Sequence, residues 1–167
     1  MRTHPDPDPF HDHDHDACSG AVLEQALARL QAEGARLTPV RRRTLEILLE
    51  SHQAMGAYDV LQRLSAEGFG SQPPVAYRAL DFLVTHGLVH RVQRLNAYAA
   101  CLSPQKDHSP IFLICRGCDK VAETGSADLR QAITGLGASR SFTIERTTVE
   151  ILGLCSQCVA AGTEALA

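Results

Sequence analysis

Four of the six cysteines in this 167-residue chain form two Cys-x-x-Cys pairs. The pairs are CRGC, with Cys115 and Cys118, and CSQC, with Cys155 and Cys158. Each pair offers two thiolates from one tight turn, and four thiolates in a closed tetrahedron make a structural zinc site. The 36 residues between the pairs leave room for a strand, a helix and another strand. We therefore predict one structural Zn²⁺ held by all four cysteines.

Other interpretations of the cysteine pairs are weaker. The N-terminus is acidic and polar and lacks an apolar signal segment, so we expect a cytoplasmic protein whose thiols stay reduced. A redox Cys-x-x-Cys normally stands alone near a βαβ pattern, which this sequence does not show. Four unpaired buried thiols remain as an alternative. Because no run of about 18 apolar residues occurs, we expect no membrane partner.

A second group of metal-ligand residue types is spread through the middle of the chain. His90 and Cys101 lie on two short apolar segments that predict a β-hairpin, which would bring them together. His108 lies in the connector that follows, and Glu123 comes five residues after Cys118. Two nitrogens, one sulfur and one oxygen suit a tetrahedral zinc ion. The alternatives are that Cys101 is a core residue and that the connector histidine is merely solvated.

The stretch FHDHDHDAC also contains metal-ligand residue types, but its surroundings predict a disordered tail over residues 1–18. This tail alternates proline and aspartate and has little apolar surface to bury. The free energy gained by burial would therefore not compensate for the conformational entropy lost on ordering. His11, His13 and His15 could bind a divalent ion weakly. A flexible site must be ordered on binding, which lowers its affinity. The tail therefore remains an accessory, or alternatively a weak metal scavenger.

The elements expected to position these residues begin with four amphipathic helices, over 19–34, 38–51, 57–68 and 73–87. Ser19 and Thr38 are the expected caps of the first two helices, and glycines end the first, third and fourth. Two strands, 88–92 and 97–101, follow and are joined by a turn around Asn96. This order predicts a winged helix-turn-helix domain over 19–102, with the fourth helix placed to enter a DNA groove.

A second, smaller α+β domain is predicted over 110–167, after a hinge at 103–109. Its expected elements are strands at IFLIC and KVAET, a helix capped by Ser126, and a long β-rich stretch, SFTIERTTVEIL. A unit of this size has little core of its own, so it needs a metal or a partner chain for stability.

The charge pattern permits a nucleic-acid partner without demanding one. The net charge is −3, yet a basic run, Arg41, Arg42 and Arg43, opens the second helix and is expected to meet phosphates. Such a run can also be only a solvated helix face. On the fourth helix, Tyr77 and Arg78 lie off the apolar stripe, and Arg78 is a candidate for a bidentate contact to guanine. Tyr77 could instead be a packing aromatic.

Together, the segments RLTPVRRRTLEIL, AYDVLQRL, PPVAYRALDFLVTHGLVHRV and EILGLCSQC resemble the ferric uptake regulator (Fur) family, and within it the zinc uptake regulator branch. The resemblance runs from about residue 20 to 160. It implies a homodimeric, zinc-responsive repressor of zinc uptake and homeostasis genes that binds double-stranded operator DNA. It also implies two Zn²⁺ per chain and recognition-helix contacts by Tyr77 and Arg78. The implied structural ligands are Cys115, Cys118, Cys155 and Cys158, and the implied sensory ligands are His90, Cys101, His108 and Glu123.

The resulting hypothesis is a switch in which one metal ion joins ligands from the DNA-reading domain, the hinge and the dimerisation domain. An iron(II)-responsive repressor is the alternative, although the soft thiolate of Cys101 favours zinc. An enzyme with Cys101 as nucleophile and His90 or His108 as base lacks an orienting group and a phosphate-binding loop. We therefore predict no catalysis and no small-molecule substrate. A zinc buffer acting through the tail is a further alternative.

Overall fold

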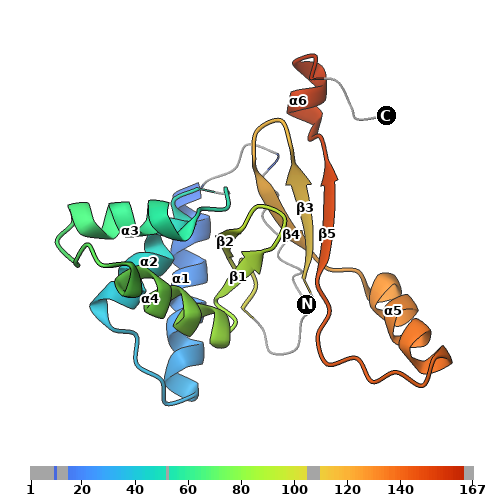
Figure 1. The fold of residues 1–167 in the computed structure, drawn as a ribbon, viewed down its shortest axis with the longest axis horizontal. Coiled ribbons are helices and arrows are strands. Elements are labelled where there is room, and N and C mark those ends of the chain that lie inside the picture. Colours follow the sequence, from blue (N-terminus) through green and yellow to red (C-terminus); the bar gives the residue numbers. More distant parts are fainter. Residues whose placement is uncertain (1–9, 11–14, 52, 105–109, 164–167) are drawn as a thin grey trace.

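The computed structural model describes residue 10 and residues 15–51, 53–104 and 110–163. Figure 1 shows a helical unit and a three-stranded sheet, with a two-stranded hairpin between them. This mixed architecture confirms the α+β class predicted from the sequence. The tail histidines 11 and 13, and the hinge residue His108, lie outside the described residues.

The helical unit consists of α1 (His15–Ala32), α2 (Pro39–Leu49), α3 (Ala57–Ala66) and α4 (Pro73–Thr85). Its core is built from the predicted apolar stripes, with Leu45, Leu64 and Leu80 fully buried. Glycines terminate three of these helices as predicted. Gly34, Gly68 and Gly87 have φ angles of 65°, 83° and 64°, a left-handed conformation that a side chain disfavours. These stop signals are local, which is why the sequence predicts them well.

The predicted start of the first helix is wrong. Ser19 was expected as the cap at the end of a disordered tail, but α1 begins at His15 and Ser19 lies inside the helix. The Ser19 hydroxyl donates a hydrogen bond to the Leu49 carbonyl at the end of α2, 3.1 Å away. This tertiary contact, made with a residue 30 positions away, gives the hydroxyl a role other than capping. The first helix thus begins inside the segment 1–18 for which the sequence predicts a tail.

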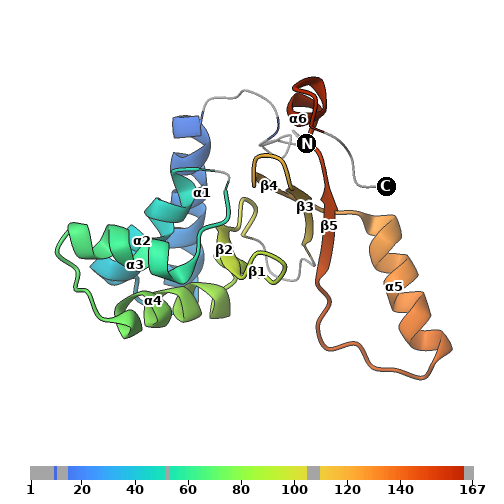
Figure 2. The same cartoon turned by 45° about the horizontal axis from the view of Figure 1, so that its top comes forward.

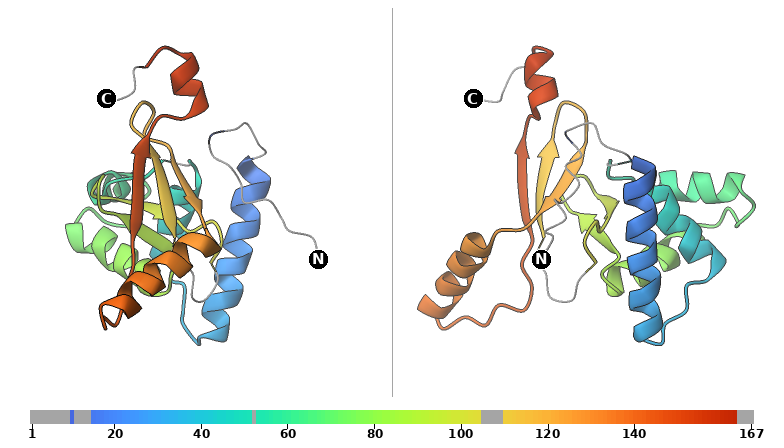
Figure 3. Two further views of the ribbon diagram at one scale, coloured as in Figure 1. Left: turned by 90° about the vertical axis from the view of Figure 1, so that its right-hand side faces the viewer. Right: turned by 180° about the vertical axis from the view of Figure 1, so that it is seen from behind.

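The hairpin predicted as a wing is present as β1 (Val89–Val92) and β2 (Ala97–Ala100), paired antiparallel with His90 opposite Ala99. Asn96 lies in the turn between them, as predicted, and takes a positive φ of 47° there. Met55 pairs with Tyr98 in an isolated bridge that adds a short third segment beside β2. From behind, Figure 3 shows this hairpin lying between the helical unit and the sheet.

The second unit is a sheet with strand order β4-β3-β5, formed by β3 (Ile111–Cys115), β4 (Val121–Thr124) and β5 (Val149–Gly153). β3 pairs antiparallel with β4 and parallel with β5. The helix α5 (Ala127–Ser139) is capped by Ser126, whose hydroxyl accepts a hydrogen bond from the Leu129 N–H at 3.2 Å. A short helix, α6 (Ser156–Ala160), follows β5.

The long β-rich stretch predicted at 141–152 is only partly a strand. Residues 142–148 form neither helix nor strand, and β5 begins at Val149. Figure 2 shows this segment returning from the end of α5, which stands away from the sheet. No strand of the described chain runs beside residues 142–148, so their backbone has no ladder to join despite its β-forming composition.

The two units share a small apolar cluster. Val92 of the wing packs with Phe112, Ile114 and Val121 of the sheet, and all four are buried. The helical unit has its own, larger core, so the smaller unit depends on this shared cluster. No helix in the described part of the chain is long and apolar enough to cross a membrane.

Candidate metal centres and DNA-facing surface

The four paired cysteines converge at one end of the sheet. Cys115 ends β3, Cys118 follows in the tight turn to β4, and Cys155 and Cys158 flank the start of α6. All four sulfur atoms lie within 4.8 Å of one another, and Cys118 Sγ and Cys155 Sγ are 3.9 Å apart. Parallel pairing of β3 with β5 brings the two pairs together, because both strands run into a cysteine turn at the same end. The donor set suits a closed tetrahedral zinc site.

The backbone around this cluster favours thiolate at one position. Burial alone would raise the pKa of Cys115, but N–H groups of Cys155, Gly117 and Cys118 donate to its sulfur and lower the pKa to about 6. Elsewhere in the cluster, the hydrogen bond with Cys155 and burial raise the pKa of Cys158 to about 12. The turn also needs its glycine, because a Cβ on Gly117 would lie 2.9 Å from Cys158 Sγ.

Three of the four predicted regulatory ligands meet between the two units. The ligand atoms of His90, Cys101 and Glu123 lie within 4.8 Å of one another. The Glu123 carboxylate is 3.4 Å from His90 Nε2 and 3.7 Å from Cys101 Sγ. It also accepts a hydrogen bond from the Leu102 N–H at 3.2 Å. The fourth predicted ligand, His108, lies outside the described residues, so its assignment remains a prediction.

The hairpin register and the sheet register together build this second site. His90 lies on β1, and Cys101 directly follows β2, where its N–H donates to the Leu88 carbonyl at 2.9 Å. Glu123 comes from β4 of the other unit. A nitrogen, a sulfur and an oxygen donor held in a mostly buried position fit a zinc ion. The site therefore joins the helical unit and its hairpin to the sheet.

The electrostatic environment of Cys101 keeps its thiol protonated. The side chain is fully buried, and burial together with the nearby Glu123 carboxylate raises the pKa of Cys101 well above its usual range. A zinc ion has to displace this proton in order to bind the sulfur. Metal binding here therefore releases a proton and strengthens as the pH rises.

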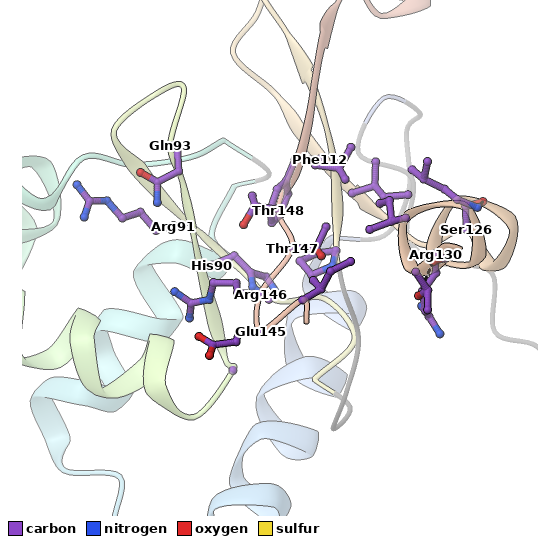
Figure 4. Close-up of a pocket in the computed structure, with 18 of the residues that line it drawn as sticks. His90, Arg91, Gln93, Phe112, Ser126, Arg130, Glu145, Arg146, Thr147 and Thr148 are labelled. Carbon is purple, nitrogen blue, oxygen red and sulfur yellow. Dashed lines mark hydrogen bonds between the residues drawn. The ribbon is translucent and has the colours of Figure 1, made fainter. Parts of the chain in front are cut away.

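Beside this site, a cleft of about 700 Å³ separates the wing from the sheet and α5 (Figure 4). His90 and Phe112 line it together with Arg91, Arg130 and Arg146. The cleft thus occupies part of the space between the wing and the sheet.

The helical unit presents a polar face on the side of α4. Tyr77 is 40% exposed and Arg78 is also exposed, while Ala76, Ala79 and Leu80 face the core. Tyr58 of α3, which the sequence reasoning missed, is 68% exposed and lies edge-on to Tyr77 with ring centroids 6.4 Å apart. The signal that could have identified it is a tyrosine at a position off the apolar stripe of α3. Two exposed tyrosines thus lie side by side, one on α3 and one on the candidate recognition helix α4, which also carries the exposed Arg78.

The three consecutive arginines of α2 have different surroundings. The Arg41 guanidinium stacks 3.6 Å over the Phe82 ring, and Arg42 pairs with Glu46 one turn later. Arg43 is held by three carboxylates, with Glu50 at 2.9 Å and with Glu46 and Glu67 also in contact. A phosphate contact by Arg43 would have to compete with this network. The sequence could not show this, because Glu67 is 24 residues away.

Comparison with known proteins gives consistent matches over most of the chain. The model of the ferric uptake regulator family matches residues 32–152. The zinc uptake regulation protein of Escherichia coli strain K12 is 34% identical over 139 residues, covering 83% of this chain and 81% of that protein. The peroxide-responsive repressor of Staphylococcus aureus strain USA300 is 24% identical over 136 residues, covering 81% of this chain and 90% of that protein.

Solved structures add information on the arrangement of the units. A zinc uptake regulator complexed with zinc and DNA matches with a TM-score of 0.82 at 32% identity, covering 86% of this chain and 97% of that chain. The holo form of XcZur gives a TM-score of 0.77 at 31% identity, covering 84% and 98%. The apo form of XcZur gives a TM-score of 0.50 at 30% identity, covering 86% of this chain and 99% of that chain. This structure is thus more similar to the holo form of XcZur than to its apo form, at nearly the same identity and coverage.

Proposed function

The chain belongs to the ferric uptake regulator family, and on that premise we propose that it is a zinc-responsive repressor that binds operator DNA as a dimer. Members of this family are transcription regulators and not enzymes, so the enzyme alternative is excluded by family. One observation carries the proposal. Residues from the wing and from the sheet, His90, Cys101 and Glu123, converge on a single metal-sized site at the boundary between the units.

Zinc is favoured over iron(II) by the chemistry of this site. Cys101 supplies a buried sulfur, and soft thiolate ligands select zinc over manganese or iron(II). The relatives named for zinc uptake, at 31–34% identity, support the same choice. We propose two Zn²⁺ per chain, one held by the four paired cysteines and one by the regulatory residues with His108 as the fourth ligand.

Dimerisation through the second unit is supported by its exposed apolar surface. β5 is an edge strand of the described sheet, and such an edge offers unpaired backbone groups to another chain. Large apolar side chains are exposed on and around it, which a small monomeric domain rarely tolerates. They are Leu136, Phe142, Ile144, Ile151, Leu152 and Val159. Residues 142–148, which lack a strand partner in one chain, would gain one from a second copy.

The proposed switch acts through geometry. Ligands on the wing and on the sheet share one ion, so a loaded site fixes the DNA-reading unit relative to the dimerisation unit. Two recognition helices can then be held about 34 Å apart, one turn of DNA. A coupling free energy of about 1–3 kcal/mol is typical of such linkage, and DNA must raise zinc affinity by the same factor. The expected cytoplasmic location remains a prediction.

The proposal is tested by measuring DNA binding at controlled free concentrations of zinc, iron(II) and manganese. The probe is a duplex selected by the zinc-loaded protein from a random-sequence pool, because the operator is unknown. We expect tight binding to appear with zinc at the lowest free concentration. Binding that is the same with and without every metal would overturn the proposal, and a response to iron(II) before zinc would favour the alternative.

We predict that Arg78→Ala will weaken discrimination at one base pair of the selected duplex by about 1–3 kcal/mol, through loss of a contact to a base edge. The matched control is Arg42→Ala, because Arg42 is an exposed arginine on a neighbouring helix. That variant is expected to weaken all duplexes alike and to lower the salt slope by about one. Titrations against single-base variants at several salt concentrations separate the two effects. An Arg78→Ala variant that loses affinity equally for every duplex would refute base recognition.

A further inference from the structure

One transverse row of the sheet faces the wing and touches it at three places. In the strand register, Phe112 of β3 lies opposite Glu123 of β4 and opposite Glu150 of β5, so the three side chains share one face. Glu123 approaches His90 and Cys101, and the Phe112 ring lies 5.5 Å from the His90 ring. Glu150 reaches the far end of the hairpin, beyond β1.

The Glu150 contact is a carboxylate bound to consecutive backbone groups. Its two oxygens accept hydrogen bonds from the N–H groups of Gln93 and Arg94, at 2.5 and 2.9 Å. These residues form the turn that follows β1. Hydrogen bonds to a charged acceptor are stronger than neutral ones, and this pair holds the wing turn without using a side chain of the wing.

The geometry separates the two anchoring points. Glu123 and Glu150 lie on opposite sides of β3, so they are two strand spacings, roughly 10 Å, apart. The regulatory site and the apolar contacts of Val92 hold the strands of the hairpin against the sheet. Glu150 adds a contact at the turn, and this further restricts the direction of the hairpin on the sheet.

We propose that Glu150 is a positioning residue of the switch, a latch that stabilises the same arrangement of the units that zinc favours. This inference rests on the proposed function. Because the latch and the metal site both favour one arrangement, loss of the latch shifts the population away from it. Zinc binding then has to provide the free energy that the Glu150 contact no longer contributes to this arrangement. More free zinc is therefore needed to reach the same DNA occupancy.

The test compares Glu150→Ala with Glu24→Ala, which removes a carboxylate from an exposed position on α1. Glu24 makes no hydrogen bond or ion pair with the described residues and lies outside the proposed dimer surface, so it is the matched control. For Glu150→Ala, we expect the free zinc concentration at half-maximal binding of the selected duplex to rise about tenfold. Glu24→Ala should match the unaltered protein. Hydrogen exchange of the Gln93 and Arg94 amides in the zinc-loaded protein should accelerate only in Glu150→Ala.

Glu150→Gln keeps one acceptor oxygen, so we expect its free zinc concentration at half-maximal DNA binding, the zinc midpoint, to be intermediate. This conservative variant provides a second test in case the alanine variant misfolds. The idea is overturned if Glu150→Ala keeps the zinc midpoint and the amide exchange of the unaltered protein. It is also overturned if Glu150→Ala and Glu150→Gln both lose the zinc of the cysteine cluster, since the residue would then serve folding. If DNA binding by the unaltered protein does not respond to zinc, the proposed function itself is wrong.

Discussion

Replacing Cys101 with serine is expected to abolish zinc-dependent DNA binding while the chain stays folded. The fully buried sulfur is the soft donor of the regulatory site, and a serine hydroxyl at the same position binds zinc poorly. Without that ligand, zinc no longer ties the wing to the sheet. The affinity for the selected duplex should then fall by the coupling factor, about 5–150-fold.

Metal content and DNA titration measure this outcome together. One zinc per chain should be lost, namely the one that a chelator removes first, and the zinc of the paired cysteines should remain. Cys18→Ser is the matched control, because it replaces a cysteine that belongs to neither proposed ligand set. A Cys101→Ser protein that still binds DNA in proportion to free zinc would show that the regulatory ligands have been assigned wrongly.

Replacing Cys155 with serine is expected to unfold the second unit, whereas Cys101→Ser leaves the chain folded and removes only the zinc response. The second unit has only a small shared apolar cluster, whereas the helical unit has an extensive core of its own. Structural zinc sites contribute on the order of 10 kcal/mol in small peptides. Losing one of four ligands should therefore unfold the sheet and α6 and leave α1 to α4 in place.

Limited proteolysis with mass spectrometry distinguishes these two units. We expect rapid cleavage within 110–163 and protection within 15–104 in Cys155→Ser, and no such difference in Cys101→Ser. Dimerisation should also be lost with the second unit. A Cys155→Ser chain that keeps a protease-resistant second unit after chelation would mean that the four cysteines are not a structural zinc site.

Local signals explain why much of the fold was predictable. The apolar stripes of α2 to α4 and the glycine stops at Gly34, Gly68 and Gly87 depend on neighbours within a few residues. Ser126 as the cap of α5 and Asn96 in the wing turn are of the same kind. These features follow from backbone preferences that each short segment carries by itself.

Features that depend on distant neighbours were predicted less well. The sequence predicts Ser19 as a cap, because its hydrogen bond to the Leu49 carbonyl depends on a distant part of the chain. The basic run was treated as uniform, although Arg43 is engaged by Glu67 from another helix. Residues 142–148 look like a strand, but a strand requires a partner, and the described chain provides none.

The sequence by itself determined the ligand types and the two cysteine turns, because Cys-x-x-Cys spacing places two thiolates in one turn wherever it occurs. It also determined the helices of the DNA-reading unit. Only the tertiary structure decided that Glu123, Phe112 and Glu150 form one row, and that this row meets the wing at both the metal site and the turn. The physical reason is register: which residues of separate strands lie opposite one another depends on the packing of the whole sheet, and no short segment specifies it.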